Sequence, residues 1–545
     1  MLFAQERASN TEVSSIGPSQ RSVVVFWGFL VTAVVVLFCC MSDGLRSQHI
    51  APPAEQLATV QSSSDSVTSV ETTDKDPRSS ANNFFDRSAM TFILNMIADV
   101  APAGILPVAS GIAHIGFVPS LICLLIILCL CVYTMWMTAR NCEITGSPQL
   151  DRQWEIVIGK GTKWVPILAT GIACFGDNVA FASFFSDIFM EAFSVVGVDM
   201  SRTRCCVMFS AFPILPLCLT NNLSALGPTS AIGVSAIIFT LIAMTCRALD
   251  GTYRGGGVYY RELKTDSWPG DSPAFPRNYH LYAISFLACL KLLNTLSMSF
   301  LTHYNACKYY RELTAATPAR FTKLTAIALS TCASFYCLSA AMGYATFGYH
   351  AEEMILGNYA PDDKLLNVAR FAMGVALVVA YPVTFAGLRE NVMTLLKLLL
   401  PSEKLPVDLS FVQDLTTTFF VICVAIIAIN LVDDRLMIGL VGSICGSGVI
   451  FILPTFLHIF AASGLENSQG SMFHVRFAKL LLVFGLFILV VSTIEIIIGH
   501  ESAQELGRRA PAMCRQKAHQ KHIWAPWSHQ TEWHYKWWEH DSCFH

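Results

Sequence analysis

The stretch TFILNMIADVAPAGILPVASGIAHIG, residues 91–116, decides the fold of this chain. It is apolar enough to cross a bilayer, but Pro102, Gly104 and Pro107 interrupt it. Proline removes a backbone donor and glycine weakens a helix, so this helix should unwind at residues 101–107 and leave backbone N–H and C=O groups free. Inside a membrane, such groups are tolerated only around a cavity or a ligand. The stretch therefore predicts a broken helix that forms the floor of a substrate site; the alternative is a structural helix kinked by proline.

The composition indicates an all-α membrane protein that crosses the bilayer many times. The 545 residues are 53% hydrophobic and 14% charged, with a mean hydropathy of +0.50, which is too apolar for a soluble domain. The net charge is only −3 and basic residues are spread over loops, so nucleic acid is not an expected partner. The 19 cysteines lie mostly in apolar runs without zinc spacing, so we expect no metal and no cofactor. The plasma membrane and an endomembrane remain open as its location.

Three regions follow from the distribution of polar residues. Residues 1–89 contain one apolar run, 22–41, which is a signal anchor or a cleaved signal peptide, and then a Ser/Thr-rich linker that is predicted to be disordered. Residues 90–500 form the membrane core. Residues 501–545 are rich in Trp and His, which favours an interfacial aromatic segment. An out-of-frame gene model would have a similar tail, and a metal-binding alternative rests only on scattered histidines.

The core contains about eleven apolar spans. After the opening stretch we predict spans at residues 117–139, 164–193, 205–219, 229–248, 281–300, 324–347, 365–388, 411–432, 436–462 and 477–498. The connections after the second, sixth and eighth spans are basic, and this count places them on one side of the membrane. Positive loops face the cytosol, so the core should begin there, and the acidic loop 349–364 should lie on the opposite side.

Three further motifs accompany these spans. The sequence SMSFLTHYNACKYYREL, residues 297–313, places hydroxyls and His303 at membrane depth and predicts a second broken helix. The eighth span ends in AYPVTFAGLRE, with Pro382 late in the span. The tenth contains GLVGSICGSGVIFILP, a row of small residues that lets helices approach closely.

In these motifs the chain resembles the amino acid/auxin permease family, especially its neutral amino-acid transporters. The likeness covers residues 88–498, and the motifs fall in order along the spans. They are Asn95 followed by Pro102-Ala103-Gly104-Ile105-Leu106, His303 followed by Tyr310-Arg311-Glu312-Leu313, Tyr381-Pro382-Val383 with Gly387-Leu388-Arg389, the link from Pro216-Leu217 to Leu223-Ser224-Ala225-Leu226, and Gly442 to Pro454.

The resemblance implies a LeuT-like fold of two five-helix inverted repeats plus an eleventh helix, with the first and sixth helices broken around the substrate. It implies that the backbone of Ala103, Gly104 and Ile105 holds the substrate carboxylate. Phe300, Leu301 and Thr302 are expected to face the substrate's amine and side chain, and Asn95 and Phe181 complete the expected substrate site.

Some positions depart from the family pattern. Phe181 stands where the family often has tyrosine, which removes one contact to the carboxylate, and Pro102 replaces the first glycine of the pair. Ala380 stands where sodium-coupled members tend to offer a hydroxyl. Asp99 and Asp177 add carboxylates inside spans, and such residues usually serve ions, protons or substrates. A buried carboxylate favours its protonated form, so Asp99 is expected to carry a coupling proton rather than sodium. A hard cation bound by Asp99, or a plain hydrogen bond to Asn95, is the alternative.

We therefore expect a secondary active transporter of small neutral amino acids that works by alternating access. The alternatives are a transporter of cationic amino acids or amines, with Asp99 or Asp177 as the counter-charge, and an amino-acid sensor that binds without flux. A membrane enzyme is not expected, because no paired intramembrane histidines and no Ser/His/Asp set share one depth.

Overall fold

The computed structural model describes residues 85–509, with gaps at residues 196, 221–225, 255, 260–285, 349–350, 352–353, 400–408, 431–438, 440 and 464–468. The predicted apolar run 22–41 and the linker up to residue 84 lie outside the described residues. The tail predicted to start at residue 501 begins within the last helix, which continues to Arg509, and its remainder also lies outside them.

The elements that the structure describes between residues 85 and 509 are all helices. The longer ones are α4 (Arg87–Ile105), α6 (Phe117–Thr145), α8 (Trp164–Val195), α11 (Gly227–Asp250), α14 (Pro318–Phe347), α15 (Lys364–Leu399), α16 (Leu409–Asn430) and α19 (Gln469–Arg509). The shorter ones are α5 (Val108–Ile115), α7 (Leu150–Val157), α9 (Arg202–Phe209), α10 (Leu215–Cys218), α12 (Phe286–Ser299), α13 (Ala306–Glu312) and α18 (Leu453–Ser463). Short irregular helices η4 (Lys160–Thr162), η5 (Ser210–Ile214), η7 (His303–Asn305), η9 (Ile355–Asn358) and η11 (Val441–Ile452) complete them.

Nine helical stretches in this described part are long and apolar enough to cross a membrane. Two predicted spans correspond to shorter helices: residues 205–219 to α9, η5 and α10, and residues 281–300 to α12, which follows an undescribed stretch. Large apolar side chains stay exposed along the outer helices, for example Ile122 on α6 and Phe419 and Ile422 on α16. Such faces suit lipid, so the chain is a multi-pass integral membrane protein.

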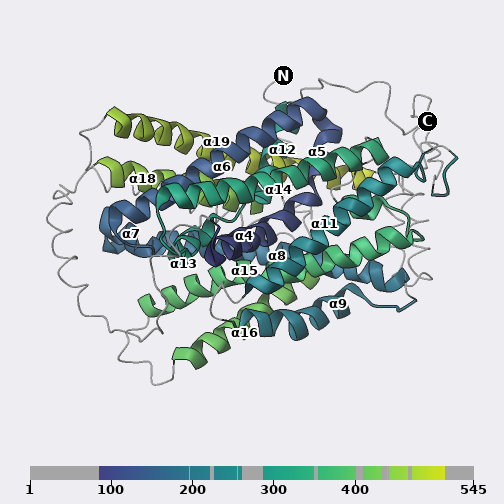
Figure 1. The fold of residues 1–545 in the computed structure, drawn as a ribbon, viewed down its shortest axis with the longest axis horizontal. Helices are drawn as coiled ribbons and strands as arrows, with labels where there is room; N and C mark the ends of the chain where they lie inside the picture. The colour runs from purple at the N-terminus through teal and green to yellow at the C-terminus, as the bar shows by residue number, and fades with distance from the viewer. Residues whose placement is uncertain are drawn as a thin grey trace. The chain divides into compact units, whose positions relative to one another are not determined.

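Helix α4 is surrounded by other helices. It packs against α11, α12, α14 and α15 (Figure 1), while α15 packs along α8 and α11. The small residues of η11 let it approach α12 closely, because a Cβ on Gly442 would lie 2.7 Å from the carbonyl oxygen of Asn294. Helix α12 contacts both α4 and η11. This packing therefore holds the interrupted segment at the end of α4 beside the one at the end of α12.

Candidate functional site

The first interruption is shorter than the sequence predicts. Helix α4 continues through Pro102 to Ile105, and only Leu106 and Pro107 are non-helical before α5. Hydroxyls from α14 hold the carbonyls of this turn, because Ser339 donates to Ile105 O at 2.8 Å and the Tyr336 hydroxyl lies 2.7 Å from Val100 O. The expectation of an unwound segment over residues 101–107 was therefore too long, and Ala103, Gly104 and Ile105 lie in the last turn of α4.

The second interruption lies where the sequence predicts it. Helix α12 ends at Ser299, residues 300–302 are non-helical, and the chain resumes as η7 and α13. Thr302 has φ −147° and ψ 4°, which leaves the helical region. The turn is held by its own backbone, because the Phe300 and Leu301 N–H groups donate to Leu296 O and Met298 O, and Thr302 O accepts from the Asn305 N–H, each at 3.0 Å.

Tyr336 of α14 joins the two interrupted segments. Its hydroxyl oxygen lies 2.7 Å from Val100 O in α4 and 2.7 Å from Ser299 O at the end of α12. Its ring packs edge-on against Phe300, with the ring centroids 5.2 Å apart, and a Cβ on Gly104 would overlap the same ring. Gly104 is thus required for the close approach of α4 and α14.

Asp99 is buried at the point where these segments meet. Its Oδ2 accepts a 2.7 Å hydrogen bond from Thr302, and its Oδ1 accepts bonds from Thr384 at 2.7 Å and Tyr304 at 3.1 Å. These residues come from α4, the second interruption, α15 and η7. The carboxylate therefore connects the two interrupted segments to α15.

Asp177 of α8 reaches the same tyrosine. The Tyr304 hydroxyl lies 3.0 Å from Asp177 Oδ2 and 3.2 Å from Thr384 Oγ1. The other oxygen of this carboxyl, Oδ1, is buried and has no hydrogen-bond partner among the described residues. The two carboxylates singled out in the sequence thus share one hydroxyl.

The remaining predicted site residues are all buried near these segments. Asn95 lies one turn before Asp99 on α4, and Phe181 lies one turn after Asp177 on α8. Phe300 and Leu301 belong to the second interruption, and neither exposes more than 2% of its surface. The structure joins Asp99 and Thr302 by a hydrogen bond, and it brings Phe300 and Gly104 together through the ring of Tyr336.

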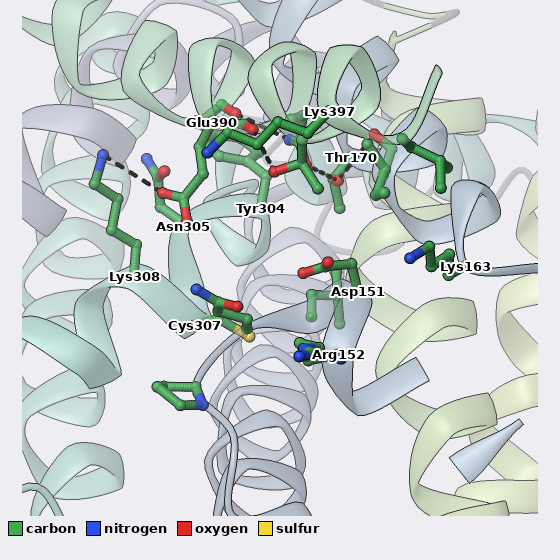
Figure 2. A pocket seen from close by; sticks show the side chains of 18 residues that line it. Asp151, Arg152, Lys163, Thr170, Tyr304, Asn305, Cys307, Lys308, Glu390 and Lys397 are labelled. Atoms are coloured by element: carbon green, nitrogen blue, oxygen red, sulfur yellow. Dashed lines mark hydrogen bonds and ion pairs between the residues drawn. The ribbon is translucent and has the colours of Figure 1, made fainter. Parts of the chain in front are cut away.

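A cavity of about 490 Å³ opens beside Tyr304. Figure 2 shows its charged lining, in which Lys308 is paired with Glu390 at 3.7 Å. The other charged side chains that line it are Asp151, Arg152, Lys163 and Lys397. Its cations come from the three basic connections of the sequence, which confirms that these connections share one end of the helices.

Sequence reasoning missed three residues of the site. Tyr304 follows directly after His303 in the quoted motif, but its hydroxyl contacts depend on α8 and α15. Thr384 lies two residues after Pro382 and supplies a hydroxyl close to the position where Ala380 lacks one. Tyr336 lies in a helix without any unusual motif. Among the described residues, no group of three or more His, Cys, Asp or Glu side chains could bind a metal ion.

Comparison with known proteins gives a family match across most of the chain. Residues 86–498 match the family model described as "Transmembrane amino acid transporter protein". Vacuolar amino acid transporter 2 of Saccharomyces cerevisiae is 21% identical over 74% of this chain and 82% of its own length. Amino acid transporter AVT6E of Arabidopsis thaliana is 22% identical over 56% of this chain and 62% of its own length.

Two other matches are more remote or shorter. A human protein provisionally named as sodium-coupled neutral amino acid transporter 11 is 22% identical over 53% of this chain and 65% of its own length. Among solved structures, a mutant of the manganese transporter of Eremococcus coleocola has a TM-score of 0.45 and 14% identity. That comparison covers 85% of this chain and 95% of the other.

Proposed function

Because the chain belongs to the transmembrane amino acid transporter protein family, we propose that it is a secondary active transporter that moves small neutral amino acids together with protons. The family is one of membrane transporters, so the chain is not an enzyme, as its sequence predicts. In this proposal the solute binds between the two interrupted segments, and two five-helix repeats with an eleventh helix expose it to each side in turn.

One observation carries the proposal. Thr302, in the second interruption, donates to Asp99, which lies two turns before the first interruption. A solute that binds against Phe300, Leu301 and Thr302 would therefore move a group that is hydrogen-bonded to a buried carboxylate. This hydrogen bond therefore links substrate binding to the protonation of Asp99, and coupled transport requires such a link.

Counting hydrogens around Tyr304 supports a proton as the coupling ion. A phenol has one hydrogen, and an ionised carboxylate only accepts, so Tyr304 can donate to Asp99 or to Asp177 but not to both. Its hydroxyl oxygen lies within 3.1 Å of both carboxyls. One additional proton on either carboxyl supplies the missing hydrogen and satisfies both contacts.

The distance between the carboxyls supports the same assignment. Oxygens that contact one hydroxyl lie within about 6 Å of each other, so two ionised carboxylates would repel by about 3 kcal/mol at an effective dielectric constant of about 20. Within the described residues, every hydrogen bond that these carboxyls accept comes from a hydroxyl and not from a cation. Binding one proton relieves this repulsion.

Sodium is the main alternative ion. Thr384 supplies a hydroxyl oxygen to Asp99 even though Ala380 does not, and one relative carries a sodium-coupled name. The contacts of Thr302 and Thr384 with Asp99 are hydroxyl-to-carboxylate hydrogen bonds of 2.7 Å, which direct hydrogens toward the carboxylate. A cation would need these hydroxyls to turn away, so the observed arrangement favours the proton.

The apolar residues of the proposed substrate site support a neutral solute. Ala103, Ile105, Phe181, Phe300 and Leu301 offer apolar side chains, and burying a charged side chain among them is costly unless it is paired. A cationic amino acid paired with Asp99 or Asp177 is the alternative substrate. It would have to displace hydroxyls that already bond to these carboxyls.

Transport into liposomes tests the proposal. The purified full-length protein is reconstituted and given a labelled mixture of the protein amino acids under an inward proton gradient, an equal sodium gradient, or neither. We expect accumulation with the proton gradient only and competition by unlabelled small neutral amino acids rather than by lysine. Binding of the label without flux would instead identify a sensor.

A further inference from the structure

Tyr304 contacts the carboxyl pair and also borders the cavity. Its hydroxyl faces Asp99 and Asp177, and the residue is one of those that line the 490 Å³ cavity at the end of the basic connections. The residue is only 8% exposed, and its ring packs against Gly387, where an added Cβ would lie 3.3 Å from Tyr304 Cδ2. Figure 2 shows Tyr304 among the residues that line this cavity.

We propose that Tyr304 is both the proton relay between Asp99 and Asp177 and the side chain that closes the cytosolic cavity. This inference rests on the proposed proton-coupled transport. When Asp99 carries the proton, its O–H donates to the Tyr304 oxygen while the Tyr304 hydrogen passes to Asp177. One O–H bond breaks and one forms at the tyrosine, the phenol stays neutral, and one proton has moved from Asp99 to Asp177.

The fold gives this transfer a direction. Asp99 is bonded to Thr302 of the second interruption, on the side where the solute is proposed to bind. Asp177 follows Thr170 and Cys174 at helical spacing on α8, so the three share a face. Thr170 lines the cavity, and Cys174 Sγ would lie 3.0 Å from a Cβ on Gly387, which also lines it. This face leads from the carboxyl pair to the cavity.

The unpartnered oxygen of Asp177 agrees with this direction. Asp177 Oδ1 is buried and receives no hydrogen bond within the described residues, so it can accept one from a water that enters from the cavity. The ionisable groups that interact with the relay are Asp99 from α4, Cys174 from α8, Tyr309 from α13, Cys332 and Tyr336 from α14, and Cys445 from η11. From α15 the relay is faced by the hydroxyl of Thr384.

Two variants of Tyr304 separate the two roles. Tyr304→Phe keeps the ring and removes the relay hydroxyl, whereas Tyr304→Ala also removes the ring that closes the cavity. Each is reconstituted as the full chain, and Tyr310→Phe, whose ring packs against Phe321 instead, is the matched control. The measurements are counterflow of the labelled amino-acid mixture, its accumulation under a proton gradient, and proton entry reported by a trapped pH-sensitive dye.

For Tyr304→Phe we expect gradient-driven accumulation to fall at least about tenfold further than counterflow does. For Tyr304→Ala we expect proton entry without substrate. Full accumulation by Tyr304→Phe would contradict the relay. If Tyr304→Ala retains counterflow and its vesicles admit no protons in the absence of substrate, the closure is contradicted. Counterflow also shows that each variant is folded.

The unaltered protein tests the premise separately. If it performs counterflow but does not respond to the proton gradient, proton coupling fails and the relay fails with it. If it performs no counterflow, the transport assignment itself fails. A defect confined to the Tyr304 variants concerns the relay and the closure alone.

Discussion

The Thr302 hydroxyl donates a 2.7 Å hydrogen bond to Asp99 Oδ2 across 203 residues of sequence. It joins the non-helical turn after α12 to a carboxylate in the middle of α4. A change in one of these segments must therefore alter the hydrogen bonding of the other.

Removing the charge of Asp99 should uncouple transport. Asp99→Asn keeps the shape of the side chain but cannot bind and release a proton at this site. We expect counterflow of the labelled mixture to remain and accumulation under a proton gradient to disappear. Asp414→Asn, an exposed position on α16, should behave as the unaltered protein. Concentrative uptake by Asp99→Asn would transfer the role to Asp177 or exclude a proton.

The Thr302 hydroxyl should contribute to substrate affinity through Asp99. Hydrogen bonds to charged groups contribute about 1.5 to 3 kcal/mol, so Thr302→Val should raise the KM for uptake roughly tenfold or more. Thr302→Ser restores the hydroxyl and should recover most of the affinity. Equal KM values for the Val and Ser variants would mean that the methyl group, and not the hydrogen bond, matters.

Enlarging Gly104 should displace Tyr336. A Cβ at this position would overlap the Tyr336 ring, so the hydroxyl would lose its contacts to Val100 O and Ser299 O. Gly104→Val should abolish uptake while the protein still reaches the membrane, as seen by surface biotinylation or membrane fractionation. Gly448→Ala is a suitable control, because a Cβ there meets open space. Near-normal uptake by Gly104→Val would remove this turn from the site.

The buried carboxylate of Asp363 should stabilise the end of the core opposite the cavity. It directly precedes α15 and accepts 2.8 Å bonds from Arg247 Nε and Nη2 and a 3.0 Å bond from Tyr253. Burial alone would raise the pKa of Asp363, but the hydrogen bonds from Arg247, the Leu366 N–H and Tyr253 outweigh it and lower that pKa below 3.8. The stabilisation is therefore present above about pH 4 and is lost as the pH falls through the lowered pKa.

Asp363→Asn tests this contribution. Breaking a buried pair costs roughly 3 kcal/mol, so the variant should unfold at a clearly lower temperature at pH 7 and lose less on acidification than the unaltered protein. Differential scanning fluorimetry in detergent measures both effects. The neighbouring exposed residue gives the control Asp362→Asn, which should match the unaltered protein. Equal melting temperatures for the two variants would contradict the prediction.

The cavity end should face the cytosol. The cations that line it come from the basic connections, and positive loops stay on that side. In sealed cells, an impermeant thiol reagent should label Asp362→Cys but not Arg152→Cys above the background of the native cysteines. Permeabilisation should expose Arg152→Cys. The reverse pattern would invert the topology and with it the direction of the proposed relay.

The sequence alone determined the class of the protein and most of its spans, because apolar length is a local property. The breaks near Pro107 and Thr302, the small-residue helix and the attention drawn to Asp99 and Asp177 also follow from residue type, since proline, glycine and buried carboxylates have strong intrinsic preferences. The side on which the basic connections gather was likewise predicted from composition.

Only the tertiary structure decided the rest. The first interruption is short because Ser339 and Tyr336 of α14 bind carbonyls of α4, and Asp363 is buried because Arg247 reaches it from α11. Asp99 and Asp177 meet through Tyr304 only because α4, α8 and η7 pack together, and Thr384 joins them from 285 residues away from Asp99. Such contacts depend on the distances between helices, which local sequence patterns do not encode.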